Sequence, residues 1–388
     1  MSVDAPVATQ NDLRPGFIEL AFGEPDPGLL PVGAVRDAAA RALDTLGPAA
    51  VAYGEPEGPH ALRAGLAQRI AAREGVPVDP DDVVVTAGNS QALDQAVTAF
   101  ARPGDVALVE SPTYNLALLV LRDHPVDVVG VHHDGRGLDV DDLAATVARL
   151  RAEGRRPRLL YTIPTFHNPT GVCLAEDRRT ALLALARRED LLLVEDDVYR
   201  ELVYDGEAPP SLWSLDPEAP VLRLGTFSKS LTPGLRVGWV TGREDLRRRF
   251  MGTGMIESGG CPSQFAACVA AALLEGGEYE AHVAALRAAY RARRDALAAA
   301  LRDHLPAGCA FVVPAGGYFI WLRLPAGVTA TGLLPHAERH TVSFIPGSRF
   351  AVGGEDDHVR LAFSLYGETE LAEGARRLAA AIAAALAT

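Results

Sequence analysis

The sequence predicts an α/β protein in which a large, mostly parallel sheet is joined to a smaller α+β domain. Its 388 residues, 48% of them hydrophobic, are enough to bury a large core, and this length suggests two domains. From about residue 50 to 275, short apolar β-branched runs alternate with helical stretches, which is typical of a parallel sheet with helices on both faces. After residue 275 the pattern changes to long Ala-rich helices separated by a few strands.

Seven strands are expected in the large sheet, and helical patterns lie between several of them, such as Ser90–Phe100 and Glu176–Arg188. The expected strands are Val83–Thr86, Val106–Glu110, Val126–Val131, Arg158–Thr162, Leu191–Glu195, Val221–Leu224 and Arg236–Thr241. Binding residues in such sheets collect at the carboxyl ends of the strands. Candidate site residues stand there: Ser90, Asn168, Asp196 and Thr226.

The C-terminal unit begins with an Ala/Arg-rich helix over about Tyr279–Leu305 and ends with a second Ala-rich helix. Between them we expect strands at Gly317–Leu324, Thr341–Ile345 and His358–Phe363. Both helices are interpreted as amphipathic packing helices rather than low-complexity segments.

Composition and charge narrow the function classes. The net charge is −13 and no long basic run occurs, so the sequence lacks the positive charge that is typical of nucleic-acid-binding proteins. No apolar stretch is long enough to span a bilayer, and residues 1–16 lack the apolar core of a secretory signal. The four cysteines show neither metal-ligand spacing nor a disulfide pattern, so no metal is expected and the cytoplasm is the expected location. They are Cys173, Cys261, Cys268 and Cys309.

Lys229 is the only lysine of the chain, although Lys and Arg together number 37. Codon bias explains the excess of arginine, and it makes the retained lysine more informative. Arginine stays protonated, whereas a lysine amine can lose its proton and form an imine with an aldehyde. The hydroxyls of Thr226 and Ser228 and the charge of Arg236 lie nearby in the sequence. This group suits a ligand that carries both a phosphate and an aldehyde.

A second phosphate-binding segment is expected where a strand meets a helix. Gly88 permits a tight turn there, and the helix that follows offers free N–H groups to an anion next to Ser90 and Gln91. Such a junction is usually only a turn. Combined with Thr226 and Arg236, it indicates a phosphate cup.

Acidic residues end a very apolar strand at Asp196 and Asp197. A carboxylate at such a place is costly unless it is paired or functional. Opposite a pyridine nitrogen, it would keep the ring protonated and make it an electron sink. A helix N-cap is the competing interpretation, more so for Asp197 than for Asp196.

Together these segments resemble the fold-type I pyridoxal-phosphate enzymes, and within them the class I/II aminotransferases. The nearest branch contains aminoadipate and kynurenine aminotransferases and the catalytic domains of MocR-type regulators. The motifs are Asp196-x-x-Tyr199, the Asn168-Pro-x-Gly loop and the segment from Thr226 to Arg236. The resemblance runs from about Phe17 to the C-terminus. It implies pyridoxal 5'-phosphate as cofactor and a homodimer with shared active sites.

The resemblance also implies a role for individual residues. Lys229 would hold the cofactor, and Asp196 would face its ring nitrogen. Tyr199 and Asn168 would face the phenolic oxygen, while Tyr114 and Val198 would pack against the two ring faces. The phosphate would be bound by Ser90, Gln91, Thr226, Ser228 and Arg236, with Tyr53 reaching the phosphate of the partner subunit. The substrate carboxylate would be held by Arg360, with Gly23 and Asn168 beside it.

Two positions depart from the family pattern. His167 stands where glutamine is more usual before the Asn-Pro pair, and a contact between His167 and the substrate is an open alternative. The glycine-rich loop over residues 252–263 carries Glu257, which either selects an amine-bearing substrate or is a solvent-exposed acid.

The expected domains follow from the pattern and the resemblance. Residues 1–16 are expected to form a flexible arm, 17–45 the N-terminal part of the small domain, 46–275 the large cofactor-binding domain and 276–388 the C-terminal small domain.

The function implied is transfer of an amino group between an α-amino acid and a 2-oxo acid through an aldimine on Lys229. Elimination, replacement, decarboxylation or cyclisation of an amino acid is the first alternative, because fold and cofactor do not fix the reaction. A MocR-like sensor is the least favoured, since it needs a DNA-binding domain ahead of residue 17 and the chain is acidic.

Overall fold

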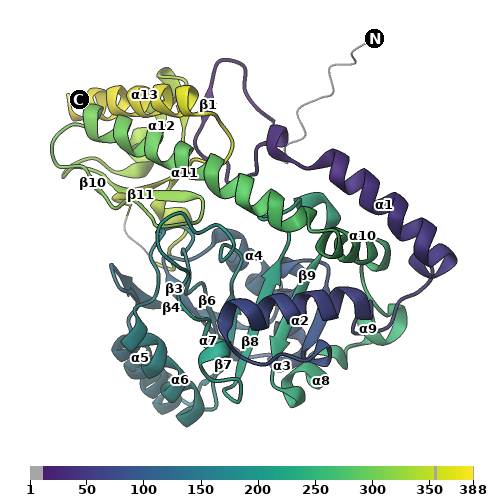
Figure 1. The fold of residues 1–388 in the computed structure, drawn as a ribbon. Helices are drawn as coiled ribbons and strands as arrows, with labels where there is room; N and C mark the ends of the chain where they lie inside the picture. Colours follow the sequence, from purple (N-terminus) through teal and green to yellow (C-terminus); the bar gives the residue numbers. More distant parts are fainter. Residues whose placement is uncertain (1–11, 354–355, 388) are drawn as a thin grey trace.

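The large sheet has eight strands in the order β2-β9-β8-β7-β6-β3-β4-β5 (Figure 1). A computed structural model describes residues 12–353 and 356–387, so most of the predicted N-terminal arm, residues 1–11, lies outside the described residues. The strands are β2 Val83–Thr86, β3 Asp105–Ser111, β4 Asp127–Asp134, β5 Gly137–Leu138, β6 Arg156–Thr162, β7 Leu192–Asp196, β8 Val221–Thr226 and β9 Gly238–Gly242.

All seven predicted strands lie in this sheet, and the prediction missed only β5 among its members. The β5 strand has two residues and pairs with the end of β4 across a tight turn, Asp134 facing Gly137. Two residues are too few to carry a period, so the pattern could not show it. Strands β9 and β5 run opposite to the other six strands, which confirms a mostly parallel sheet.

Helices cover both faces of the sheet, and the strands alternate accordingly. Val83 and Val85 pack into one core, whereas Val84 packs into the core on the opposite face. The first core contains α2 His60–Glu74, α5 Val140–Ala152, α6 Glu176–Arg188, α7 Leu212–Leu215 and α10 Gln264–Glu275. The second contains α3 Asn89–Phe100, α4 Asn115–Arg122 and α8 Glu244–Met251.

A third core belongs to the C-terminal unit. Its four-stranded antiparallel sheet has the order β10-β11-β14-β13. These strands are β10 Ala310–Phe311, β11 Phe319–Arg323, β13 Ile345–Pro346 and β14 His358–Ala362. Its helices are α11 Glu278–His304, α12 Ala330–Arg339 and α13 Glu368–Leu386. In Figure 1 the long α11 runs from the large sheet to this unit.

The predicted strand Thr341–Ile345 is in fact two strands. Its first part, β12 (Val342–Ser343), pairs in parallel with β1 (Ile18–Glu19), while β13 pairs with β14. The chain therefore changes sheets at Phe344, which is buried in the core of the C-terminal unit.

The segment after β1 connects the two units. Helix α1 (Val32–Leu46) packs on α10 of the large unit, whereas β1 lies in the C-terminal unit (Figure 1). None of the helices in the described ranges is long and apolar enough to cross a membrane.

Candidate active site

A cavity of about 830 Å³ opens at the carboxyl ends of the central strands, beside the C-terminal unit. Most of the predicted site residues line it. They are Gly23, Ser90, Tyr114, Asn168, Asp196, Tyr199, Thr226, Ser228, Lys229, Arg236 and Arg360, together with Val198. The topology brings them together because β7 and β8 end side by side and the loops after β2, β3 and β6 reach the same edge.

Lys229 lies in this cavity, three residues after the end of β8. Its Nζ donates a hydrogen bond of 2.8 Å to the carbonyl oxygen of Gly23. Burial, helped by the positive charges of Arg360 and Arg236, lowers the pKa of Lys229 to about 8. About half of the amine is therefore neutral at pH 8, where an ordinary lysine is almost fully protonated, and the neutral form is the one that reacts with an aldehyde.

One end of the cavity is a cluster of hydrogen-bond donors. The hydroxyls of Thr226 and Ser228 lie 3.0 Å apart, and Nη1 of Arg236 donates to Ser228 Oγ at 3.3 Å. Arg236 also donates from Nη2 to the carbonyl oxygen of Ala87, just before Gly88. A Cβ on Gly88 would lie 2.6 Å from Nη2 of Arg236, so only glycine leaves room for the guanidinium. With Ser90 at the start of α3, this end can hold a phosphate.

Asp196, the last residue of β7, is an acid that lines the cavity. Its carboxylate accepts hydrogen bonds of 2.6 Å from Asn89 Nδ2 and of 2.6 Å from the hydroxyl of Tyr161. Burial raises the pKa of Asp196 to about 6, although these two bonds work in the opposite direction. An ionised Asp196 is thus held ready for a cationic partner near neutral pH. Sequence reasoning missed both supporting residues, although Asn89 lies between Gly88 and Ser90.

Asp197 does not line the cavity and is paired with buried arginines instead. Its carboxylate forms ion pairs with Arg200 and with Arg223, whose Nη2 lies 2.8 Å away. Arg223 pairs in turn with the buried Glu74 at 2.5 Å. Both guanidinium groups contact the same oxygen of Asp197, Oδ2. The competing N-cap interpretation is wrong for Asp197, because the next helix along the chain begins only at Leu212.

Arg360, in β14, is a buried guanidinium at the other side of Lys229. Its Nη1 donates to Oδ1 of Asn168 at 3.1 Å, and its Nη2 donates to the carbonyl oxygen of Ala21 at 2.7 Å. Its guanidinium carbon lies 4.2 Å from the ring centroid of Phe319 and 4.9 Å from that of Phe350. Burial lowers the pKa of Arg360 to about 10, so the group stays charged at neutral pH.

Two predicted site residues do not line the cavity. The side chain of Gln91 folds back on its own helix, where it accepts from Ala87 N at 3.0 Å and donates to Gln95. Tyr53 is 90% exposed and lies outside the cavity of its own chain. Glu257, on the short helix α9 (Gly254–Gly259), is also exposed and does not line the cavity.

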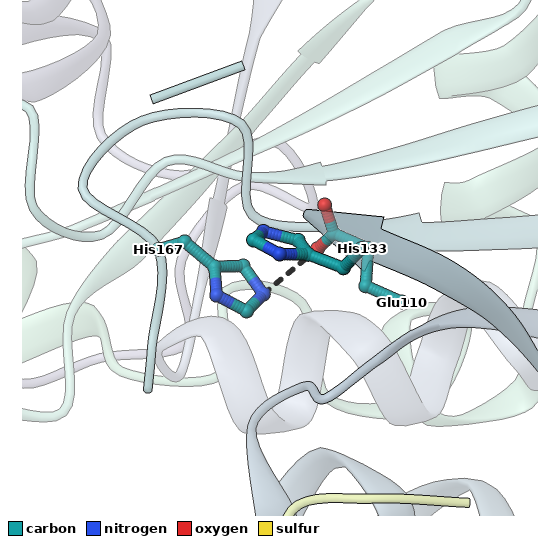
Figure 2. A group of neighbouring side chains, drawn as sticks. All are labelled: Glu110, His133 and His167. Atoms are coloured by element: carbon teal, nitrogen blue, oxygen red, sulfur yellow. Dashed lines mark ion pairs between the residues drawn. The ribbon is translucent and has the colours of Figure 1, made fainter. Parts of the chain in front are cut away.

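His167 does not line the cavity either, because its ring turns away into the protein. Figure 2 shows it beside Glu110 and His133. Its Nε2 lies 3.1 Å from Oε2 of Glu110, and its Nδ1 lies 2.9 Å from Oγ1 of Thr170. The His133 and His167 rings are in contact, with centroids 4.4 Å apart and planes tilted by 32°. These contacts, on β3, β4 and the loop after β6, anchor the loop that carries Asn168.

Comparisons with known proteins agree with this geometry. The chain matches the family "Aminotransferase class I and II" over residues 15–378. It is 35% identical to aromatic-amino-acid aminotransferase 1 of Thermococcus litoralis, covering 94% of this chain and 88% of that protein. It is also 35% identical to 2-aminoadipate transaminase of Thermus thermophilus, covering 96% and 92%.

Solved structures give the same result. The kynurenine aminotransferase of Pyrococcus horikoshii, crystallised with PMP, aligns with a TM-score of 0.88 at 35% identity, covering 95% of this chain and 91% of that one. The family match spans nearly the whole chain, and the lysine, carboxylate and donor cluster lie in one cavity. The chain therefore belongs to the class I and II aminotransferases, a family of transferases that depend on pyridoxal phosphate.

Proposed function

We propose that this chain is the subunit of a homodimeric, cytoplasmic aminotransferase in which Lys229 binds the cofactor and Arg360 binds the carboxylate of an α-amino acid. The amino group passes to a 2-oxo acid in the second half of the reaction. The observation that carries the proposal is the place of the sole lysine. Its amine, with a pKa of about 8, shares one cavity with a cluster of phosphate-type donors and with a buried arginine.

The residues of the cavity fit pyridoxal phosphate. Its phosphate would be held by Ser90, Thr226, Ser228 and Arg236, and its ring nitrogen by Asp196. Tyr114 and Val198 line the space between these two ends. When bound, the cofactor supplies an electron sink for the charge that develops at the substrate Cα. Asn89 and Tyr161 keep the carboxylate of Asp196 in place for this task.

Lys229 and Arg360 divide the work on the substrate. Arg360 orients the amino acid through its α-carboxylate, and the fork of the guanidinium fixes the direction of the Cα–H bond. The Nε of Arg360 is buried and has no hydrogen-bond partner among the described residues, so it has donor capacity left for a ligand. The neutral amine of Lys229 then moves the proton at Cα as a general base.

Tyr53 supports the shared-site part of the proposal. A tyrosine that is 90% exposed and does not line its own cavity is available to a second copy of the chain. We infer that it completes the phosphate cup of the partner subunit.

Borohydride reduction followed by peptide mapping tests the central residue. The reduced holoenzyme should carry the phosphopyridoxyl group on Lys229, and Lys229→Arg should bind no cofactor covalently and lack turnover. Turnover is measured as 2-oxo acid formed from a panel of amino acids. A reduced, cofactor-loaded protein in which Lys229 is unlabelled would refute the assignment.

A further inference from the structure

The cavity contains three cationic side chains, and the proposed function uses each of them. Lys229 reacts with the cofactor, Arg236 binds its phosphate and Arg360 binds the α-carboxylate. The other two charged residues among those that line the cavity are the acids Asp196 and Glu24. A substrate with a second carboxylate would therefore meet no cation on the described walls that is not already engaged.

The wall that remains for the substrate side chain is largely apolar. It consists of Phe22 from the N-terminal segment, Leu116 and Val120 from α4, and Ile345 from β13. Asn115 and Glu24 are the polar members of this wall. Apolar walls bind aliphatic or aromatic groups by removing their surface from water, whereas a carboxylate loses hydration there and gains no partner.

The mouth of the cavity leaves room for a large side chain. The cavity of about 830 Å³ has to hold the cofactor and the substrate together, so the exposure of its wall is more informative than its volume. Leu116 is 43% exposed, so the α4 side of the wall lies at the mouth of the cavity and can accommodate a long group.

We propose that the amino donor is a monocarboxylic amino acid with an apolar aliphatic or aromatic side chain, and that α4 is the specificity wall. This inference rests on the proposed function and deepens it. The two relatives at 35% identity are named for an aromatic and for a dicarboxylic substrate, so identity alone does not choose between these classes. The charges on the cavity wall favour the first class.

The test is a comparison of kcat/KM on the assembled holoenzyme. Leucine, methionine and phenylalanine form one group of donors, and aspartate, glutamate and 2-aminoadipate form the other. The dicarboxylic group should be at least ~30-fold poorer, because a desolvated charge without a partner is strongly disfavoured. Since the whole assembly is assayed, a cation supplied by a neighbouring subunit would appear as high dicarboxylate activity and would overturn the inference.

A cation placed on the wall should change the preference. Leu116→Arg should raise the ratio of kcat/KM for 2-aminoadipate over that for leucine by roughly tenfold, the effect of one charge-assisted hydrogen bond. Leu119→Arg is the matched control, since Leu119 lies on the same helix, is 51% exposed and does not line the cavity. It should leave the ratio unchanged.

The outcomes separate this inference from the proposed function. Turnover of amino acids with a preference for dicarboxylates would leave the aminotransferase intact and overturn the inference. A ratio that Leu116→Arg and Leu119→Arg alter equally, or not at all, would overturn the assignment of α4 as the wall. Turnover of no amino acid in either group would refute the proposed function, and the inference with it.

Discussion

Asp196 and Asp197 are neighbours in the chain, but their carboxylates bind different partners. Asp196 accepts from Asn89 and Tyr161 in the cavity, whereas Asp197 pairs with Arg200 and Arg223. Asp196 is thus available to a ligand, whereas Asp197 is engaged in ion pairs with two buried guanidinium groups.

Substitution of Asp196 should mainly lower activity, whereas substitution of Asp197 should mainly lower stability. Asp196→Asn should lower kcat/KM at least ~30-fold, because the ring nitrogen loses an ionic partner, and it should leave the fold stable. Asp197→Asn should lower the free energy of unfolding by about 3 kcal/mol, because breaking a buried pair leaves uncompensated charge. Urea unfolding and steady-state kinetics on the folded fraction measure the two effects. If Asp197→Asn abolishes turnover of stable protein while Asp196→Asn is active, the assignment of the ring-nitrogen partner is reversed.

Arg360 should be required for amino acids but not for simple amines. Arg360→Leu should raise KM for amino acids by roughly 30-fold or more, because the bidentate contact with the carboxylate is lost, and it should preserve the absorbance of the bound cofactor. Arg360→Lys should recover only part of this, since a point charge cannot reproduce the fork between Phe319 and Phe350.

The matched comparison for Arg360 uses an amino acid and its decarboxylated amine with both proteins. Only the amino acid should be affected by the substitution. Equal weakening of both compounds would show that Arg360 acts on the fold rather than on the carboxylate.

Cofactor binding should require glycine at position 88 for two reasons: the positive φ angle, and the space that a Cβ would take from Arg236. Gly88 and Gly104 both have φ of +85°, so alanine costs about 1–2 kcal/mol of backbone strain at either place. Only at Gly88 would the new Cβ displace Arg236; nothing lies within 4 Å of a Cβ at Gly104. Gly88→Ala should therefore weaken pyridoxal phosphate binding at least ~10-fold more than Gly104→Ala, since a contact to a charged group is disturbed. Equal affinities by equilibrium titration would contradict this.

Tyr53 provides the test of shared sites. Tyr53→Phe and Lys229→Ala should each impair turnover strongly in their own homodimers. In a mixed dimer, one of the two sites would have both its lysine and an intact partner tyrosine, so activity should return toward half of the wild-type value per dimer. Chain exchange is verified by native mass spectrometry. Verified mixed dimers without recovered activity would show that each chain builds its site alone.

His133 should make the fold sensitive to mild acid. Burial and His167 lower the pKa of His133 from 6.5 to about 3. Between these values the unfolded chain binds more protons than the folded one, so the free energy of unfolding should fall as the pH is lowered below about 6.5, by up to about 1.4 kcal/mol per pH unit.

His133→Asn should remove this part of the pH dependence between pH 7 and 5. His132→Asn is the matched control, because His132 is the preceding residue of β4 and is exposed. Urea unfolding at several pH values gives the slopes. Parallel curves for wild type and His133→Asn would exclude His133 as the source.

Much of the architecture could be predicted because the central strands are buried on both faces. Runs such as Val83–Val85 are apolar throughout, and helical stretches separate them, which is a strong local signal. Two features depend on pairing between distant segments, and no local sequence pattern predicts them. These are the two-residue strand β5 and the division of Thr341–Ile345 between two sheets.

Those site residues that come at or just after the end of a strand could be predicted from the sequence. Asn168, Asp196 and Thr226 all reach the cavity because parallel strands end at one edge. Tyr161 could not be found this way, since it lies inside a strand that reads as core, and only the fold places its hydroxyl on Asp196. The side-chain amide of Gln91 is instead hydrogen-bonded to Ala87 and Gln95, and such local pairing cannot be read from the sequence.

The bond from Lys229 to the carbonyl of Gly23 has a chemical consequence. A carbonyl oxygen only accepts, so it takes one N–H of the amine and leaves the nitrogen lone pair unoccupied; a carboxylate in its place would have favoured the ammonium form instead. Two residues earlier, the carbonyl of Ala21 holds Arg360. The main chain from Ala21 to Gly23 thus helps to set the distance between the Lys229 amine and the Arg360 guanidinium. A displacement of this segment would shift both side chains together.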